Sequence, residues 1–352
     1  MRSRPDGVLL YGMYDVSDPR SAPKVRIAMM RGALGALGPV ETITGGRIAR
    51  AIGGIRWLAS GGPRRIGAVY VEAPTSSPMP TDLAFLAFMR LLGRPVGVYF
   101  RDAHPLFRDV HPRTHRRQLL TDLFWRGATP LLKAVASVRF APSAGLARAL
   151  RISDPVLLPP GTDPATPYLG LGEDEVVGAI VQIGPTSGFD RLLGAMEIVR
   201  RERPATRLVV VSRAVDDQSR ALPDWVHVEA AGRTSIAGIL RPARVCVLPL
   251  PINRYNDLAV AVRLFDMLAF GKPIVATDTI ESRALIEASG AGLLAPESAG
   301  GMAAAILTLL ADRGLAERCS RSGRAYAEDP ANTWEARART VRARLGLREG
   351  GS

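Results

Sequence analysis

One short segment gathers the residue types that a phosphate-bearing ligand needs. Residues 256–278 follow an apolar run that predicts a buried strand. Asn256 or Asp257 is suited to cap a helix over 258–270, and Gly271 to end it in a left-handed turn. The amides at the start of such a helix have no partners within it, so they favour an anion.

Arg263 and Asp266 lie three residues apart and therefore share one face of this predicted helix. An arginine can hold a diphosphate in a bidentate fork, and a carboxylate can accept two ribose hydroxyls. A plain surface ion pair between the two side chains is the alternative, and spacing alone favours it.

A second candidate site follows the predicted strand 96–100. Arg101, Asp102 and His104 come directly after it, and ligands of open α/β sheets bind at the carboxyl ends of strands. The alternative is a salt bridge between Arg101 and Asp102 within the loop, with a solvated histidine.

Several other chemistries lack their signals. No glycine-rich dinucleotide motif follows the first strand, and the glycine series at 32–38 lies inside a predicted helix, where close packing explains it. No Walker A sequence or nucleophile elbow is present. His111 and His115 have no third metal ligand at a useful spacing. Cys246 and Cys319 are too few for a disulfide scaffold, which fits a reducing cytosol.

The net positive charge of the chain comes entirely from its first half. The 352 residues carry a net charge of +13. Residues 1–155 hold 23 Lys or Arg and 10 Asp or Glu, whereas residues 156–352 hold 23 of each. The N-terminal half is therefore expected to meet an anionic partner. No nucleic-acid recognition motif accompanies the charge, so we predict no nucleic-acid binding.

One stretch of this basic half predicts an amphipathic helix. Residues 111–133 interleave Arg113, Arg116, Arg117, Trp125, Arg126 and Lys133 with leucines and Phe124. Such a helix suits a membrane surface, and an ordinary solvated face is the alternative. Arg20, Lys24, Arg26 and Arg31 add positive charge near the first helix. No apolar run approaches the length of about 20 residues that a transmembrane helix needs.

Short β-branched runs alternate with helical patterns along the whole chain, which predicts an α/β protein with parallel sheets. The expected strands are 8–14, 40–44, 68–73, 96–100, 138–141, 156–158, 176–183, 208–212, 226–229, 245–250, 274–277 and 292–294. Prolines and a glycine at 158–164 mark a connector, where the charge balance also changes. We therefore predict two Rossmann-like domains, facing each other across a cleft.

The segment Arg263–Asp278 resembles the donor-site signature of GT-B fold glycosyltransferases, most closely the retaining family-4 (group 1) type. Weaker landmarks occur in the same order: Leu158–Asp163, Ile183-Gly184 with Gly188–Leu193, Ala291–Leu294 and Thr333–Glu335. The resemblance implies an acceptor domain over 1–160 and a nucleotide-sugar domain over 161–330, with a helix over 331–347 that packs back onto the first.

The same resemblance implies roles for single residues. The donor would be bound by Gly184, Arg213, Asp257, Arg263 and Asp266, and the acceptor by Gly12 and Arg20. Asp102 would act as a general base if the configuration inverts, whereas His104 would hydrogen-bond the donor sugar if it is retained. Two features depart from the family: Leu258 replaces its first motif glutamate, and the loop Pro185–Ser187 lacks basic residues.

We therefore expect a hexosyltransferase that moves a sugar from a nucleotide-diphospho-sugar to an acceptor that is lipid-linked or a precursor of a cell-envelope polysaccharide. Arg263 and helix amides would replace a metal, and no cofactor is expected besides the donor substrate. We predict a cytoplasmic enzyme, peripheral at the inner face of the membrane. A sugar-nucleotide epimerase and a non-catalytic binding subunit of the same fold are the alternatives.

Overall fold

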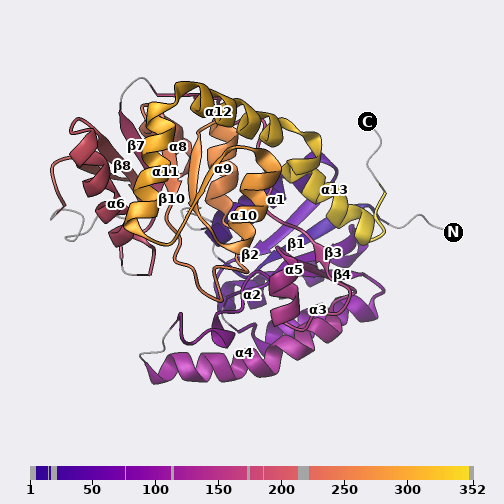
Figure 1. The fold of residues 1–352 in the computed structure, drawn as a ribbon. Helices are drawn as coiled ribbons and strands as arrows, with labels where there is room; N and C mark the ends of the chain where they lie inside the picture. The colour runs from indigo at the N-terminus through magenta and orange to yellow at the C-terminus, as the bar shows by residue number, and fades with distance from the viewer. Residues whose placement is uncertain are drawn as a thin grey trace. The chain divides into compact units, whose positions relative to one another are not determined.

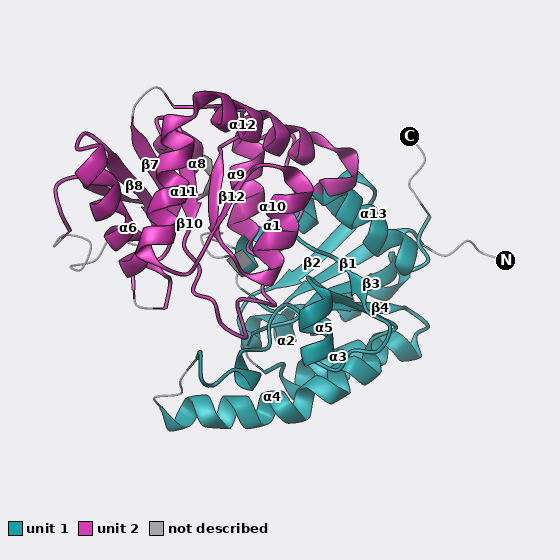
Figure 2. Ribbon diagram, in the orientation of Figure 1, with its two compact units in different colours: residues 1–160, 334–352 teal, residues 161–333 magenta. Residues whose placement is uncertain are grey.

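A computed structural model describes residues 5–14, 16, 22–75, 77–111, 115–172, 175–184, 186–212 and 222–348. The chain divides into two compact units, and each is an α/β sandwich (Figures 1 and 2). Unit 1 contains residues 1–160 and 334–352, and unit 2 contains residues 161–333. The predicted fold class, with two Rossmann-like parallel sheets, is confirmed.

The described part of unit 1 holds a parallel sheet in the order β2-β1-β3-β4-β5-β6. Its strands are β1 (Gly7–Gly12), β2 (Val40–Thr44), β3 (Ile66–Glu72), β4 (Val96–Tyr99), β5 (Val138–Ala141) and β6 (Val156–Leu157). Its helices are α1 (Ala22–Ala36), α2 (Arg47–Ala59), α3 (Pro80–Leu91), α4 (Arg116–Val135), α5 (Ala144–Ala149) and α13 (Trp334–Arg344), with short 3-10 turns η1 (Gly62–Arg64) and η2 (His104–Leu106).

The described part of unit 2 holds a second parallel sheet in the order β12-β11-β10-β7-β8-β9. Its strands are β7 (Val176–Ile180), β8 (Arg207–Ser212), β9 (Val226–Ala230), β10 (Val245–Leu248), β11 (Ile274–Thr277) and β12 (Gly292–Ala295). Its helices are α6 (Phe189–Glu202), α8 (Arg233–Leu240), α9 (Val262–Phe270), α10 (Ile280–Ser289), α11 (Ala299–Ala311) and α12 (Arg313–Glu328), followed by the 3-10 turn η3 (Pro330–Asn332).

The central strands are buried on both faces, as their continuous apolar runs predict. β1, β3 and β4 are buried throughout, and so are β10 and β11. Helix α13 lies beside α1 in unit 1, where Trp334, Ala338, Val341 and Leu345 join the core under β1 and β3. Helix α13, which follows unit 2 in the sequence, therefore completes the core of unit 1.

Within the described part of the chain, no single helix has both the length and the apolar composition to cross a membrane. Helices α11 and α12, bent by 97° relative to each other, meet that test only when they are counted as a pair, and only by length and composition.

Two helices of unit 2 end on glycines in the left-handed conformation, Gly271 after α9 (φ 65°) and Gly290 after α10 (φ 60°). They differ in their surroundings. A Cβ on Gly271 would lie 2.2 Å from the Tyr168 ring, whereas one on Gly290 would only reach ordinary contact with Ser322. The Tyr168 hydroxyl forms a hydrogen bond with Ser320 Oγ, which itself donates to the Gly271 carbonyl. The Tyr168 ring is therefore held in place.

We predict that Gly290→Ala lowers the free energy of unfolding by about 1–2 kcal/mol, the cost of a left-handed alanine. Gly271→Ala should cost about 1–3 kcal/mol more, because its methyl group must also displace the ring. Urea denaturation of both variants measures the difference, and equal losses would contradict the steric role of Tyr168.

Candidate functional site

The candidate donor site of unit 2 centres on Arg263, which lies in the first turn of α9. Its Nη1 donates to the carbonyl of Ile180, 2.6 Å away, at the carboxyl end of β7. Strand β7 pairs with β10, the strand that precedes α9. The guanidinium is thus held at the sheet edge where open α/β folds bind their ligands.

Helix α9 begins later than the sequence predicts. It starts at Val262, with Ala261 at the N-cap and no capping side chain, so the assignment of Asn256 or Asp257 as its cap is wrong. The Asn253 side chain instead accepts from the amides of Tyr255 and Asn256 and closes a separate turn. Arg263 consequently lies beside the first amides of the helix instead of more than a turn away from them.

Asp257 and Asp266 occupy different places in this unit. Asp257 Oδ1 accepts from the backbone amide of Ile280, 3.3 Å away, and so lies at the start of α10. Asp266 is half-buried on α9, one turn after Arg263. Arg213, the third polar side chain predicted at the donor site, lies outside the described residues. The donor roles of all three remain predictions.

The loop between β7 and α6 approaches the end of β10 very closely. A Cβ on Gly188 (φ 79°) would lie 1.6 Å from the carbonyl oxygen of Pro249, so glycine alone fits there. Gly184 has a φ of 145°, and Ser187 closes the turn by donating to its carbonyl at 2.6 Å. Gly188 begins one of the segments that resemble the family, and this close approach explains its glycine. The donor role of Gly184 remains a prediction.

The candidate site of unit 1 is built on Glu72, which ends β3 and is fully buried. Its carboxylate accepts from Arg26 Nε at 3.1 Å, from Arg101 Nη2 at 2.8 Å and from the Tyr70 hydroxyl at 2.7 Å. The Arg26 guanidinium also lies 3.5 Å from the centroid of the Tyr99 ring. Arg26 is therefore not surface charge, as the sequence suggested, but one of two cations that neutralise a buried carboxylate.

These contacts set the protonation states of the cluster. Burial opposes the charged form of Arg101, but the attraction of Glu72, together with smaller contributions from Tyr14, Asp102 and Tyr99, raises the pKa of Arg101. Burial raises the pKa of Tyr99 to about 12. The two arginines therefore stay charged and the tyrosine stays neutral across the physiological range.

Asp102 is positioned by a short chain of hydroxyl groups. Thr75 Oγ1 donates to Asp102 Oδ2 at 2.7 Å, and the Tyr14 hydroxyl lies 2.7 Å from Thr75 Oγ1. The Thr75 amide also donates to that hydroxyl. Arg101 lies over the Tyr14 ring at 5.2 Å. Sequence reasoning missed Glu72, Thr75 and Tyr14. The available signal was one acidic residue closing an otherwise apolar strand.

His104 begins η2, and its ring lies against that of His111, with 4.1 Å between the centroids. Gly12 ends β1 opposite Thr44, where a Cβ would lie 2.9 Å from the threonine methyl group, so its glycine is explained by packing. Arg20, the other residue predicted to bind the acceptor, lies outside the described residues. The roles assigned to His104, Gly12 and Arg20 remain predictions.

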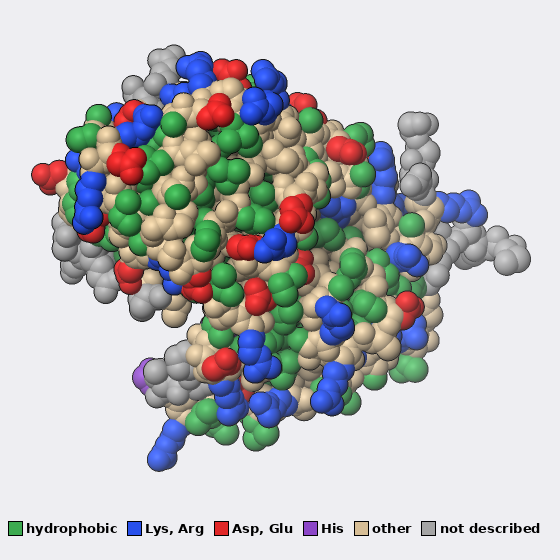
Figure 3. All heavy atoms as spheres, in the orientation of Figure 1, with side chains coloured by type: hydrophobic (Ala, Val, Ile, Leu, Met, Phe, Trp, Pro, Cys, Tyr) green, Lys and Arg blue, Asp and Glu red, His purple; other side chains and the backbone are tan. Residues whose placement is uncertain are grey.

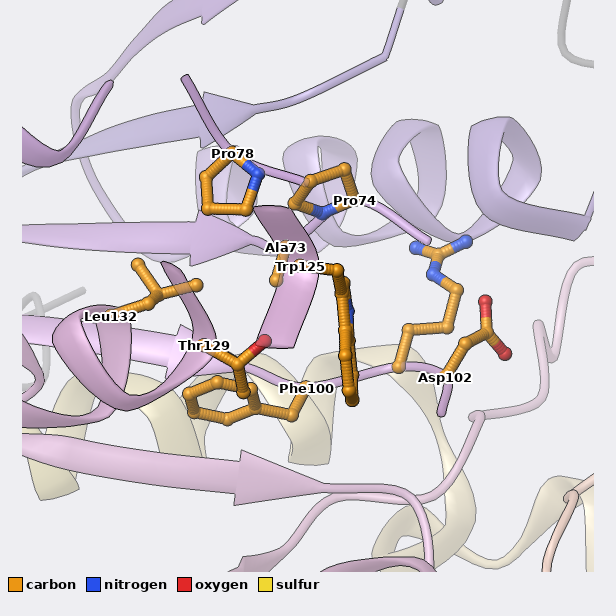
Figure 4. Close-up of a pocket in the computed structure, with 9 residues that line it drawn as sticks. Ala73, Pro74, Pro78, Phe100, Asp102, Trp125, Thr129 and Leu132 are labelled. Carbon is orange, nitrogen blue, oxygen red and sulfur yellow. The ribbon is translucent and has the colours of Figure 1, made fainter. Parts of the chain in front are cut away.

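A small cavity adjoins Asp102 at the carboxyl ends of β3 and β4 (Figure 4). Its volume of about 10 Å³ corresponds to roughly one water molecule. Pro74, Pro78, Phe100, Trp125, Thr129 and Leu132 line it beside Arg101 and Asp102. Trp125 therefore points from α4 into the unit and is 6% exposed. Its expected place on a membrane-facing surface is wrong, because the tryptophan fills the space behind the Asp102 loop.

Residues 175–312 match the family described as Glycosyl transferases group 1. The match contains the whole Arg263–Asp278 segment and lies within unit 2. It confirms the predicted resemblance to group 1 glycosyltransferases for this part of the chain. No curated protein gives a significant match to the sequence.

Solved structures resemble the whole chain at low sequence identity. Sucrose-phosphate synthase from Thermosynechococcus elongatus has a TM-score of 0.68 and 15% identity, over 96% of this chain and 97% of that one. HepE from Anabaena, in complex with UDP and glucose, has a TM-score of 0.64 and 16% identity over 96% and 99%. A putative UDP-N-acetylglucosamine 2-epimerase from Listeria monocytogenes has a TM-score of 0.57 and 13% identity over 96% and 95%.

These likenesses show the fold. The chain has the GT-B fold that these structures share, and its residues 175–312 match the group 1 glycosyltransferase family within that fold.

We predict that Glu72→Gln lowers the free energy of unfolding by about 3–5 kcal/mol, because two buried arginines lose the charge that balances them. Glu41→Gln is the matched control, since Glu41 pairs with Arg65 at the surface and its loss should cost less than about 1 kcal/mol. Urea denaturation followed by circular dichroism measures both. Equal losses would show that Glu72 has no special role.

Proposed function

We propose that the chain transfers a sugar from a nucleotide-diphospho-sugar to an acceptor hydroxyl. The observation that carries the proposal is the group 1 family match over residues 175–312, which coincides with the sheet edge where Arg263 is held. In this proposal unit 2 binds the donor and unit 1 supplies the groups that meet the acceptor.

Arg263 would neutralise the diphosphate that leaves the sugar. The bond from the anomeric carbon to the phosphate oxygen breaks, and the charge that develops on this oxygen needs a cation or donated hydrogen bonds. A guanidinium beside the first amides of α9 supplies both. On this basis the reaction needs no metal ion. Among the described residues, no three His, Cys, Asp or Glu side chains gather as a metal site requires.

The acceptor chemistry is proposed for Asp102. If the configuration inverts, its carboxylate takes the proton of the acceptor hydroxyl as the new glycosidic bond forms, and Thr75 and Tyr14 hold it for this task. If the configuration is retained, His104 instead hydrogen-bonds the donor sugar. The acceptor we propose is a lipid-linked or cell-envelope glycan precursor, consistent with the basic character of the N-terminal half.

The structure of HepE contains UDP and glucose, so UDP-sugars are the first donors to test. We predict that a UDP-sugar raises the melting temperature of the protein in a panel of nucleoside diphosphate sugars, and that Arg263→Ala weakens its binding by about tenfold or more, the effect of losing one charge-assisted hydrogen bond. Titration calorimetry measures the affinity.

Arg283→Ala is the control for this variant, because Arg283 is an exposed arginine on α10 that pairs with Asp278 and Glu287. Arg263→Lys separates charge from the bond to Ile180, since lysine keeps only a point charge. Unchanged affinity in Arg263→Ala would refute the assignment of the donor site.

A non-catalytic binding subunit is the second candidate, favoured by Leu258 and by the absence of basic residues from Pro185–Ser187. An epimerase is the third, because an epimerase structure shares this fold. Nucleoside diphosphate released only when acceptor is present would establish transfer. Release without acceptor would favour epimerisation or hydrolysis. A protein that no nucleotide sugar stabilises would lack the proposed activity altogether.

A further inference from the structure

Three helices cover one face of the unit 1 sheet. The strand order shows that three successive connections, β2 to β3, β3 to β4 and β4 to β5, all cross the sheet in the same direction. Because such crossovers are right-handed, α2, α3 and α4 lie on the same face, and α1 lies on the other. Contacts of α3 with both α2 and α4 agree, and Figure 1 shows the three helices together.

The outer surface of this layer, called here the α2–α4 face, exposes large apolar side chains on every helix. Exposure reaches 76% at Ile48, 84% at Leu91 and 68% at Phe124. The full set consists of Ile48, Ile52, Ile55, Phe88, Leu91, Leu92, Leu119, Leu120, Leu123, Phe124 and Leu131. Monomeric proteins that remain in water rarely expose so many neighbouring apolar groups.

These apolar side chains do not lie on the sides of the helices that pack into the core of unit 1. The buried residues of α2 are Arg50, Gly54 and Trp57, and its exposed isoleucines repeat with the same spacing on the opposite side. In α4 the inward side even includes Asp122, which is 1% exposed and pairs with Arg108 at 3.4 Å. A helix that turns an aspartate inward and leucines outward uses its apolar side for something outside the unit.

The charges on the α2–α4 face have a single sign. Its helices expose Arg47, Arg56, Arg90, Arg116, Arg117 and Arg126. The structure describes every residue of these three helices, and their carboxylates, Asp82 and Asp122, are both buried. Figure 3 shows blue and green side chains, with few red ones between them, along the lower rim of unit 1, where α4 runs.

We propose that the α2–α4 face docks on an anionic lipid bilayer. Leucine, isoleucine and phenylalanine would enter the boundary between headgroups and acyl chains, while the arginines stay at the level of the lipid phosphates. Two other occupants fit less well. A second copy in a two-fold contact would bring the arginines of these helices against each other, and the helices expose no carboxylate to pair them. A nucleic acid would use the arginines but leave the apolar side chains in water.

The test is co-sedimentation of the full chain with vesicles of phosphatidylcholine, with and without about a third of phosphatidylglycerol. We expect binding to the anionic vesicles, weakened but not abolished by about 0.5 M salt, because the apolar contacts are not screened. The triple variant Leu120→Gln, Leu123→Gln, Phe124→Gln and the double variant Arg116→Glu, Arg117→Glu should each bind about tenfold more weakly or worse.

Matched controls are Leu157→Gln with Ile280→Gln, and Arg318→Glu with Arg321→Glu, which are exposed outside the α2–α4 face. They should bind as the unchanged chain does. Equal losses of vesicle binding in the variants and the controls would overturn the proposal. So would the absence of binding to anionic vesicles by the unchanged chain. A dimer in sedimentation equilibrium that the triple variant dissociates, or binding to duplex DNA in place of vesicles, would overturn it too. The measurement needs no nucleotide, so it stands apart from the proposed sugar transfer.

Discussion

The architecture of unit 1 depends on one buried carboxylate. Glu72 lies at the carboxyl end of a central strand, where its charge requires compensation, and two arginines from distant parts of the chain supply it. Arg26 connects α1 to the sheet, and Arg101 fixes the second residue of the loop after β4. The position of Asp102 follows from this arrangement, since it is the next residue and is held by Thr75. Stability and site geometry therefore share one electrostatic origin.

Sequence patterns predict the elements well because the central strands are buried on both sides and the helices are amphipathic or capped by glycine. Each predicted strand overlaps an observed one. The start of α9 was wrong for a local reason. Asparagine and aspartate favour turns as well as helix caps, and here the Asn253 side chain accepts from the Asn256 amide in a turn, so that Asn256 does not cap the helix. Only the folded chain shows whether such a residue forms a turn or a helix cap.

The candidate sites were less accessible to such reasoning, because partners far apart in sequence decide them. Nothing near Arg26 indicates that it contacts a glutamate 46 residues later. The orientation of α4 is a similar case, since its leucines, arginines and tryptophan permit more than one inward side. Trp125 points inward and lines the cavity beside Asp102, and this orientation of α4 turns Phe124 and Leu123 outward. Tertiary packing thus settled which side of an ambiguous helix faces the solvent.

The place of α13 has a consequence for the order in which the protein folds during synthesis. Unit 2 is a continuous stretch of chain, whereas the core of unit 1 includes Trp334, Val341 and Leu345. Arg342, fully buried, also donates to Asp6 near the other end of the chain. Although domains commonly fold in the order in which they leave the ribosome, here the core of the unit that emerges first stays incomplete until α13 has been synthesised. The second unit can thus reach its native packing while the first still awaits its final helix.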